Sequence, residues 1–473
     1  MKTVIIQKQL LNDLRTAAKE YNCVTKPKLN LDVLVFFLSL FNSIPSQYRE
    51  EEQTDYVSLD SQLLKQHHGK YNQYFEFLKE HFIDKVSNYG ADIKRCSIFI
   101  MKNKYLNDEV ETYKITNKLL LKKFDHQGLT SLQKDKNQCC IKTRPHLVKF
   151  FDDKLTIDSK AAYNEIKPFI NSEATRRKYL TSATLIKELH NQEWKYSIKP
   201  KSDNRLHSNL TRSSKLLRKY IKYDGKPIIG VDLKTSQPFF LCVIIKAILK
   251  RDKGLLEQIK ATDILNDSVI ESLFNLELNR RELISFAQSI LNKDFYTEFQ
   301  HKLNIDFDED GKPFRMVSNY TRKKKYRSRS KQEPKRKVIF ETPRELVKAV
   351  VMEIFYSKPR TTIKEAKIFR ETYPSVSRIF KCFDDHDVKF SYLLQYIEAY
   401  VLLDYTAKKI NQSHPNMPLF SIHDALVTNE DWQHILEVEM SKHIKYITTL
   451  QPNLDIEDWK ESLDILGNKR IVI

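Results

Sequence analysis

Glycine is scarce in this sequence, with 8 among 473 residues, and no G-x-x-x-x-G-K-[ST] phosphate-binding loop occurs. That absence argues against a P-loop motor or kinase. The 6 cysteines show neither C-x-x-C spacing nor a histidine array, so we expect a reduced intracellular protein without a zinc ribbon. The longest apolar runs, residues 33–41 and 238–245, are too short to cross a bilayer, and we expect no membrane contact.

The stretch MKTVIIQKQLLNDLRTAAKE is broken by acidic and polar residues and has no small-residue cleavage site. We therefore expect no secretory signal and a cytoplasmic protein. The sequence is rich in Lys, Ile, Asn and Tyr, which suggests an AT-rich genome. That composition favours a phage or mobile element, in which case the compartment is the host cytoplasm.

Positive charge is what the sequence has in excess, since 80 Lys and Arg outnumber 61 Asp and Glu to give a net charge of +19. An excess of this size favours a polyanionic partner, nucleic acid first and an anionic membrane second. Hydrophobic residues make up 41% and aromatic residues 11% of the chain, which indicates a folded protein. The length suits two or three domains.

The first domain is expected over residues 1–165, with helices up to about residue 50. Residues 55–116 resemble a winged-helix module: two short amphipathic helices separated by Gly69, then the strand-like pieces CSIFIMKN and EVETYKIT. The second helix would offer Lys70, Asn72 and Gln73 to a DNA groove. An ordinary helical domain is the alternative, because such patterns are short and degenerate.

Residues 166–228 are expected to form a helical connecting or thumb-like region, and residues 229–473 the remaining domain. Within the latter, residues 321–337 carry ten Lys or Arg among seventeen residues. Nothing in this loop can be buried, so we expect it to be mobile. It is either a solvated loop or a clamp on a phosphate backbone, and the overall charge favours the clamp, with Lys323 and Lys324 among its contacts.

The stretch IIGVDLKTSQPFFL contains a carboxylate at the end of an apolar strand, Asp232. Burying a carboxylate is unfavourable unless something pairs with it, and a metal ion is a natural partner. A helix N-cap is the common alternative for an aspartate in this position.

The stretch TPRELVKAVVMEIFYSK predicts a helix, because Thr342 to Glu345 match a capping box with Pro343 at the first helical position. The apolar residues form one face. Arg344, Lys348, Met352 and Tyr356 recur every four residues and share another face. Two cations followed by an aromatic ring suit a triphosphate and a stacked base. Ordinary solvated charges on a surface helix are the alternative.

The stretch LFSIHDALV has the pattern of a hairpin with His423 and Asp424 at or near its bend. A polar turn is the plain interpretation. The alternative is a second metal-binding carboxylate, since two divalent ions roughly 4 Å apart can clamp the attacking and leaving oxygens of a phosphoryl transfer.

In this order, the three stretches resemble motifs A (229–241), B (342–358) and C (419–428) of the family A DNA polymerases and the related single-subunit phage-type RNA polymerases. The segment RLHSNLT…LLRKYI, Arg205 to Ile221, is similar to the one that precedes motif A. Residues 369–380 and 393–410 resemble the region before motif C. The resemblance covers about residues 200–430 and implies a mostly helical α+β right-hand polymerase, with an antiparallel palm sheet and helical fingers and thumb.

The resemblance also implies roles for individual residues. Asp232 and Asp424 would be catalytic and hold two Mg²⁺ ions, helped by the backbone carbonyl of Leu233. Arg344 and Lys348 would bind the triphosphate, and Tyr356 would pack near the templating position. The primer and template, both DNA, would be bound by His423, Arg205, Arg212, Lys215, Arg218, Lys323 and Lys324.

The departures from the family pattern leave the nucleotide type open. Gln237, five residues after Asp232, is bulky where DNA polymerases have a glutamate that closes off the sugar 2′ position, which favours deoxynucleotides. Features of motifs B and C point instead to RNA polymerases. Ser357 replaces a glycine, and Ala425 replaces a glutamate or serine, so we expect no third acidic group near the metals.

The leading hypothesis is a template-directed nucleotidyltransferase, a DNA-dependent DNA polymerase that uses two metal ions. A single-subunit DNA-dependent RNA polymerase is the first alternative. A replication initiator or defence protein whose polymerase-like domain only binds DNA is the second.

Overall fold

The computed structural model describes residues 2–47, 54–87, 96–125, 128–172, 175–200, 202–318, 335–357, 361 and 363–460. The chain divides into two compact units. The first comprises Met1–Ile198 and Leu206–Ile228, and the second Lys199–Arg205 and Ile229–Ile473. Of the region expected over residues 166–228, residues 166–198 and 206–228 lie in the first unit and residues 199–205 in the second.

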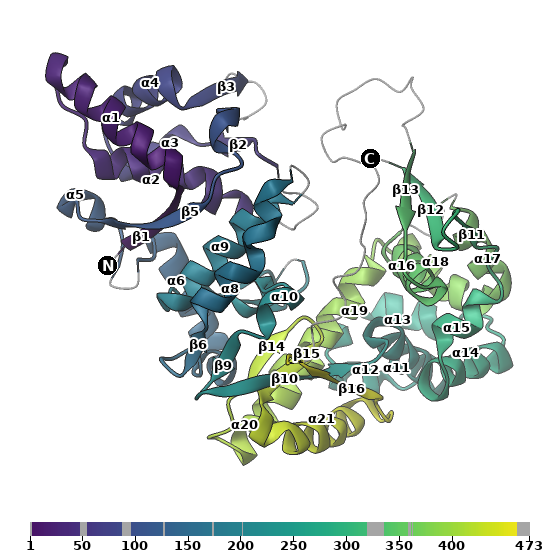
Figure 1. The fold of residues 1–473 in the computed structure, drawn as a ribbon. Coiled ribbons are helices and arrows are strands. Elements are labelled where there is room, and N and C mark those ends of the chain that lie inside the picture. Colours follow the sequence, from purple (N-terminus) through teal and green to yellow (C-terminus); the bar gives the residue numbers. More distant parts are fainter. Residues whose placement is uncertain are drawn as a thin grey trace. The chain divides into compact units, whose positions relative to one another are not determined.

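The first unit mixes helices with short antiparallel strands (Figure 1). Its elements are β1 (Lys2–Gln7), α1 (Lys8–Val24), α2 (Leu31–Ser43), β2 (Val57–Leu59), α3 (Ser61–His67), α4 (Tyr71–His81), β3 (Ile83–Ser87), β4 (Ser97–Met101), β5 (Val110–Ile115), α5 (Lys118–Leu121), α6 (Ser131–Thr143), α7 (Pro145–Val148), β6 (Leu155–Ile157), α8 (Ser159–Ile166), α9 (Arg176–His190), β7 (Ser197–Ile198), β8 (Leu206–His207), α10 (Lys215–Arg218), β9 (Ile221–Tyr223) and the start of β10 (Lys226–Leu233).

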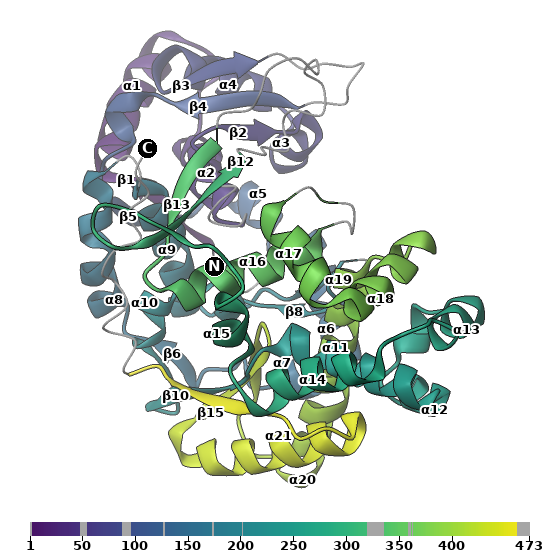
Figure 2. The ribbon, with the colours of Figure 1, turned by 90° about the vertical axis from the view of Figure 1, so that its right-hand side faces the viewer.

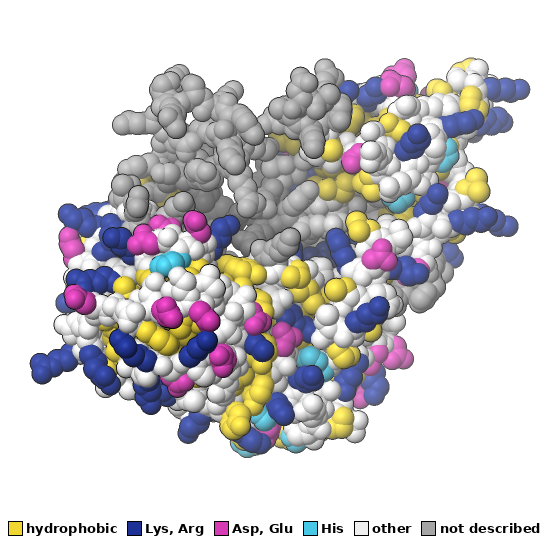
Figure 3. Space-filling model, turned by 180° about the vertical axis from the view of Figure 1, so that it is seen from behind, with side chains coloured by type: hydrophobic (Ala, Val, Ile, Leu, Met, Phe, Trp, Pro, Cys, Tyr) yellow, Lys and Arg dark blue, Asp and Glu magenta, His cyan; other side chains and the backbone are white. Residues whose placement is uncertain are grey.

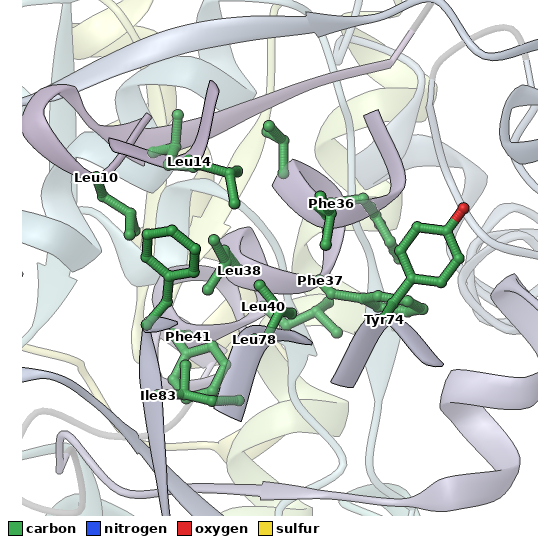
Figure 4. Packing of buried hydrophobic residues seen from close by; sticks show 14 of the residues in the cluster. Leu10, Leu14, Phe36, Phe37, Leu38, Leu40, Phe41, Tyr74, Leu78 and Ile83 are labelled. Atoms are coloured by element: carbon green, nitrogen blue, oxygen red, sulfur yellow. The ribbon is translucent and has the colours of Figure 1, made fainter. Parts of the chain in front are cut away.

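The N-terminal core is built around α2, whose residues are nearly all buried. Asn30 caps this helix by accepting from Val33 N at 3.3 Å, a typical N-cap arrangement. Phe37 and Phe41 of α2 pack with Leu10 of α1 and with Leu78 of α4 in one cluster (Figure 4). A helix that is apolar on all sides is stable only when other elements surround it.

The module resembling a winged helix consists of β2, α3, α4, β3 and β4, with the strands paired in the order β2-β4-β3. The two helices lie where the sequence placed them, but the wing is different. The partner of β4 is Ile83–Ser87, whereas Val110–Ile115 pairs with Lys2–Gln7 in a separate two-stranded sheet. The chain also starts with a strand where only helices were expected.

In the second unit, mainly helical segments surround an antiparallel sheet. Its elements after β10 are α11 (Ser236–Lys250), α12 (Lys253–Gln258), α13 (Asp267–Phe274), α14 (Arg280–Asn292), α15 (Phe295–Gln300), β11 (Asp306–Phe307), β12 (Pro313–Ser318), β13 (Lys335–Ile339), α16 (Pro343–Tyr356), α17 (Lys364–Thr372), α18 (Pro374–Asp385), α19 (Phe390–Ala399), α20 (Ala407–Ser413), β14 (Phe420–Ile422), β15 (Ala425–Asn429), α21 (Gln433–Thr448) and β16 (Leu454–Asp458).

The sheet of the second unit has the order β14-β15-β10, with β16 paired to β10 as well. The segment Ile229–Leu233 is thus the inner strand, and its run of apolar residues suits that place. Helix α21 packs against β15 and lies along this sheet (Figures 1 and 2). Helix α19 continues through a π-helical segment, Tyr400–Thr406, into α20.

A three-stranded sheet, β11-β12-β13, stands between α15 and α16 in the sequence. Strand β13 begins at Lys335, so the last residues of the basic segment 321–337 pair with β12 instead of forming loop. Lys323 and Lys324 lie outside the described residues. In the view of Figure 3, Lys and Arg side chains are spread over the surface with Asp and Glu among them.

The mostly helical α+β class expected from the sequence is confirmed, with antiparallel pairing in every strand register that the structure gives. No helix within the described ranges is both long enough and apolar enough to span a membrane.

Candidate active site

Asp232 lies near the end of β10, directly opposite Asp455 in the pairing with β16. The strand forms because Ile228 to Val231 are buried apolar residues of high strand propensity, with only Gly230 among them lacking a side chain. Leu233 ends the strand with a buried side chain. Thr235 then takes a left-handed conformation with φ of 50°, and α11 begins at Ser236.

Asp424 lies in the turn of the β14–β15 hairpin. Ile422 pairs with Ala425, so His423 and Asp424 form a two-residue connection. His423 has a positive φ of 54°, and Asp424 is not among the residues of positive φ. The hairpin predicted from the sequence is therefore confirmed, with the exposed His423 and the half-buried Asp424 at its bend.

The carboxylates of Asp232 and Asp424 lie close enough to affect one another. Burial, and after it the charge of Asp424, together raise the pKa of Asp232 to about 7, and Lys348 acts in the opposite direction. Asp232 Oδ1 is buried and has no hydrogen-bond partner. A buried, unpartnered carboxylate oxygen beside a second carboxylate is unfavourable as it stands, and a bound cation would satisfy it.

The carboxylates of Asp232 and Asp424 are chemically suited to a divalent cation. Asp232 and Asp424 supply oxygen ligands, which Mg²⁺ prefers, and Mg²⁺ commonly binds through one or two carboxylates while keeping several waters. Within the described ranges, no three His, Cys, Asp or Glu side chains gather as a ready-made metal cluster. The donors thus suit an ion that completes its shell with water and substrate oxygens, and not a closed structural site.

Helix α16 presents the predicted cations on its exposed side. Thr342 Oγ1 accepts a hydrogen bond of 3.2 Å from Glu345 N, as the capping pattern predicted. The apolar face is buried, as predicted, through Leu346, Val347, Val350, Val351, Ile354 and Phe355.

The three predicted nucleotide-binding residues of α16 have different surroundings. Arg344 Nε donates to Asp294 Oδ2 at 2.6 Å. Lys348 is exposed and acts electrostatically on Asp232. The Tyr356 hydroxyl accepts a hydrogen bond of 2.5 Å from the Gln395 amide on α19, and its ring is 45% exposed. The positive side of α16 and the carboxylates of the sheet are therefore neighbours.

Glu398 of α19 is an acidic residue that sequence reasoning missed. It is only 1% exposed and accepts hydrogen bonds from Arg205, Ser236 and Gln237. Burial raises the pKa of the Glu398 carboxyl, the Arg205 guanidinium opposes that rise, and the charge of Asp424 adds to it. Helix α19 thus brings an acidic residue from outside the three motifs into the electrostatic neighbourhood of Asp232 and Asp424.

The bonds of Glu398 use both of its carboxylate oxygens. Oε1 accepts from Arg205 and Oε2 accepts from Ser236 and Gln237, so the group is bonded to the protein and not presented as a metal ligand. Arg205, predicted to bind primer or template, is thus paired with a buried carboxylate. Gln237 is 4% exposed.

Three other predicted contacts to primer or template lie in the first unit. The guanidinium of Arg212 is paired with Glu188, a buried carboxylate that also binds Lys195 and Asn209. Arg218 is 7% exposed, whereas Lys215 is exposed. Arg212 and Arg218 are therefore largely internal, whereas Lys215 lies at an exposed position.

Comparison with known proteins identifies no family for this chain. No family model and no curated protein matches the chain. Among solved structures it is similar to the POL domain of Pol1 from M. smegmatis in complex with DNA primer-template and dNTP, at 14% identity and a TM-score of 0.32. The match covers 64% of this chain and 56% of that chain, a little over half its length. At this distance the likeness assigns neither family nor activity.

Proposed function

We propose that the second unit is a template-directed nucleotidyltransferase, a DNA-dependent DNA polymerase of the family A type. The observation that supports it best is the buried, unpartnered oxygen of Asp232 beside the Asp424 carboxylate, with Lys348 acting on the same group. Two carboxylates, one near a strand end and one in a hairpin turn, with cations from a nearby helix, supply the metal ligands and positive charge that phosphoryl transfer to a growing chain requires.

In this proposal Asp232, Asp424 and the Leu233 carbonyl hold two Mg²⁺ ions, which supply charge stabilisation for the transferred phosphoryl group when bound. Arg344 and Lys348 bind the triphosphate and stabilise the charge that develops on the leaving pyrophosphate. Tyr356, half-exposed at the end of α16, packs near the templating base. His423, exposed at the hairpin bend, contacts the primer terminus, and catalysis is mainly positioning and electrostatics.

Deoxynucleotides are the proposed substrates, because the bulky Gln237 stands five residues after Asp232. A single-subunit RNA polymerase is the alternative. Extension of a primed DNA template with each nucleotide type separates the two, since incorporation of ribonucleotides alone would refute the DNA polymerase.

The decisive experiment is primer extension in Mg²⁺ with the unchanged chain, Asp232→Ala and Asp424→Ala. Either substitution should abolish extension while circular dichroism shows an intact fold. Glu430→Ala is the matched control, because Glu430 is an acidic residue of the same unit that bonds with the exposed Lys460 and should retain extension. Extension by either aspartate variant would exclude the assignment.

DNA binding without catalysis is the second candidate function, and the strand order β2-β4-β3 around α3 and α4 favours it. That order is the one a winged helix has, with α4 as the helix that enters a groove. Lys70 and Asn72 are exposed at the start of α4, whereas Gln73 donates to Pro27 O at 3.0 Å. Duplex binding that weakens steeply with salt, together with no incorporation of either nucleotide type, would favour this function.

A further inference from the structure

Glu398 joins three parts of the second unit in one buried hydrogen-bond network. It lies on α19, which packs against both α11 and α16. Its Oε1 accepts from Arg205, and its Oε2 accepts from Ser236 Oγ and from Gln237 Nε2, the latter at 2.6 Å. Replacing a buried ion pair by apolar residues is often neutral or stabilising. Stability alone therefore does not explain a buried charge at this position.

The bond to Glu398 fixes how the side chain of Gln237 lies. An ionised carboxylate can only accept hydrogen bonds, so the amide of Gln237 must turn its NH₂ group toward Glu398. Gln237 Oε1 is then buried without a hydrogen-bond partner. Burying an unsatisfied acceptor costs free energy, and this cost disfavours the orientation. The Gln237 side chain is thus held in place by Glu398 despite an unsatisfied acceptor.

We propose that Glu398 is the positioning residue that sets the choice between ribonucleotides and deoxyribonucleotides, by holding Gln237 at the sugar of the incoming nucleotide. This inference rests on the proposed polymerase function. A bulky side chain rejects a 2′-hydroxyl only if it cannot swing aside, so selection depends on the group that locks its rotamer. Glu398 locks Gln237 from a helix outside the three motifs.

The test compares kcat/KM for a deoxynucleotide with kcat/KM for the matching ribonucleotide in Mg²⁺. Glu398→Met, whose thioether accepts hydrogen bonds only weakly, should move this ratio toward one by about tenfold, the effect of one such hydrogen bond, mainly through a lower KM for the ribonucleotide. A merely structural role would lower kcat/KM for both nucleotides equally. A Glu398→Met variant that keeps the ratio of the unchanged chain would overturn the inference.

A second variant guards against misfolding, because Glu398→Met leaves the Arg205 guanidinium without its carboxylate. Gln237→Leu removes the hydrogen bond and keeps the Arg205–Glu398 pair and most of the side-chain bulk. It should move the ratio in the same direction, and the double variant should move it no further, since both changes break one contact. Additive effects would show that the two residues act separately and overturn the inference.

Tyr396→Phe is the matched control on α19. Its hydroxyl donates to Asp263 at 2.8 Å, so the change removes a hydrogen bond from the same helix without touching Gln237, and the ratio should not move. A ratio that moves equally in this control would assign the effect to α19 as a whole. If the unchanged chain incorporates neither nucleotide, the proposed function fails and the inference with it. Incorporation with an unchanged ratio in the variants overturns the inference alone.

Discussion

Arg344 is held by Asp294, whose carboxylate accepts a hydrogen bond of 2.6 Å from Arg344 Nε. The Cζ atom of Arg344 lies 5.3 Å from the ring centroid of Tyr296, which follows Asp294 by two residues. Asp294 also caps α15 by accepting from the backbone of Tyr296 and Thr297. The hydrogen bond from Nε therefore orients the Arg344 guanidinium. Its two terminal NH₂ groups can still form a bidentate contact with a phosphate, because that contact does not use Nε.

The first prediction follows from that orientation. Asp294→Asn should raise the KM for the nucleotide by about two- to fivefold, the effect of one exposed ion pair, while kcat changes little. Because Asn caps a helix as well as Asp does, the melting temperature should stay the same. Arg344→Lys should lower kcat/KM more strongly, since a lysine cannot form the two-pronged contact. An unchanged KM in Asp294→Asn would show that Asp294 does not orient Arg344.

The second prediction concerns pH and the first unit. Burial, together with the smaller effects of Lys123 and Lys2, lowers the pKa of His67 to about 4, and the ring stacks on Phe124 at 5.6 Å between centroids. In the unfolded chain the pKa is 6.5, so between these values the unfolded state binds more protons. Stability is therefore lost as the pH falls from 6.5 toward 4, by about 2 kcal/mol at pH 5.

Hydrogen exchange of the α3 and α4 amides at pH 7 and pH 5 measures this loss. His67→Gln should reduce the difference between the two pH values. His81→Gln is the control, because the His81 side chain is 39% exposed and should leave the difference as it is. Equal pH dependence in the unchanged chain and in His67→Gln would contradict the prediction.

The helices and strands that the sequence predicted well are those whose conformation depends on residues close together in the sequence. The start of α16 follows from Thr342 and Pro343, and its buried face follows from the spacing of its apolar residues. The β14–β15 hairpin likewise depends on a turn within one short stretch. By contrast, β1 pairs with β5 more than a hundred residues away, and β3 has only Ile83 fully buried, so neither carries a local signal.

Glu398 shows why the candidate site was only partly predictable. The stretch LLQYIEAYVLLDY is typical of a buried helix, and its one glutamate gives no indication of a partner. That partner, Arg205, is 193 residues earlier in the chain. The available signal was the cost of burying a charge, which implies a cation somewhere, but only the folded chain shows which one. The same limit applies to Arg212, whose partner Glu188 was not evident from the sequence.

The third prediction separates structure from DNA binding in the first unit. Arg212→Met should destabilise this unit by roughly 1–3 kcal/mol, because the buried Glu188 carboxylate loses one of its two cations and keeps Lys195. Lys215→Met, at an exposed position, should leave stability nearly unchanged. If α10 contacts DNA, Lys215→Met should reduce the slope of log affinity against log salt concentration by about the amount that one phosphate contact contributes. Thermal melting and binding titrations at several salt concentrations measure both effects, and an Arg212→Met variant as stable as the unchanged chain would contradict the internal role.

The last prediction tests the cation site without relying on activity. Asp232→Asn should raise the melting temperature in the absence of divalent ions, because it removes a buried charge that Asp424 repels. Mg²⁺ should then raise the melting temperature of the unchanged chain, since a ligand that binds only the folded state stabilises it by about 1.4 kcal/mol at roughly ten times its Kd. The Asp232→Asn variant should lose most of that response, while Glu430→Gln should keep it. A Mg²⁺ response that survives in Asp232→Asn, or no response in the unchanged chain at millimolar Mg²⁺, would show that these carboxylates do not form the metal site.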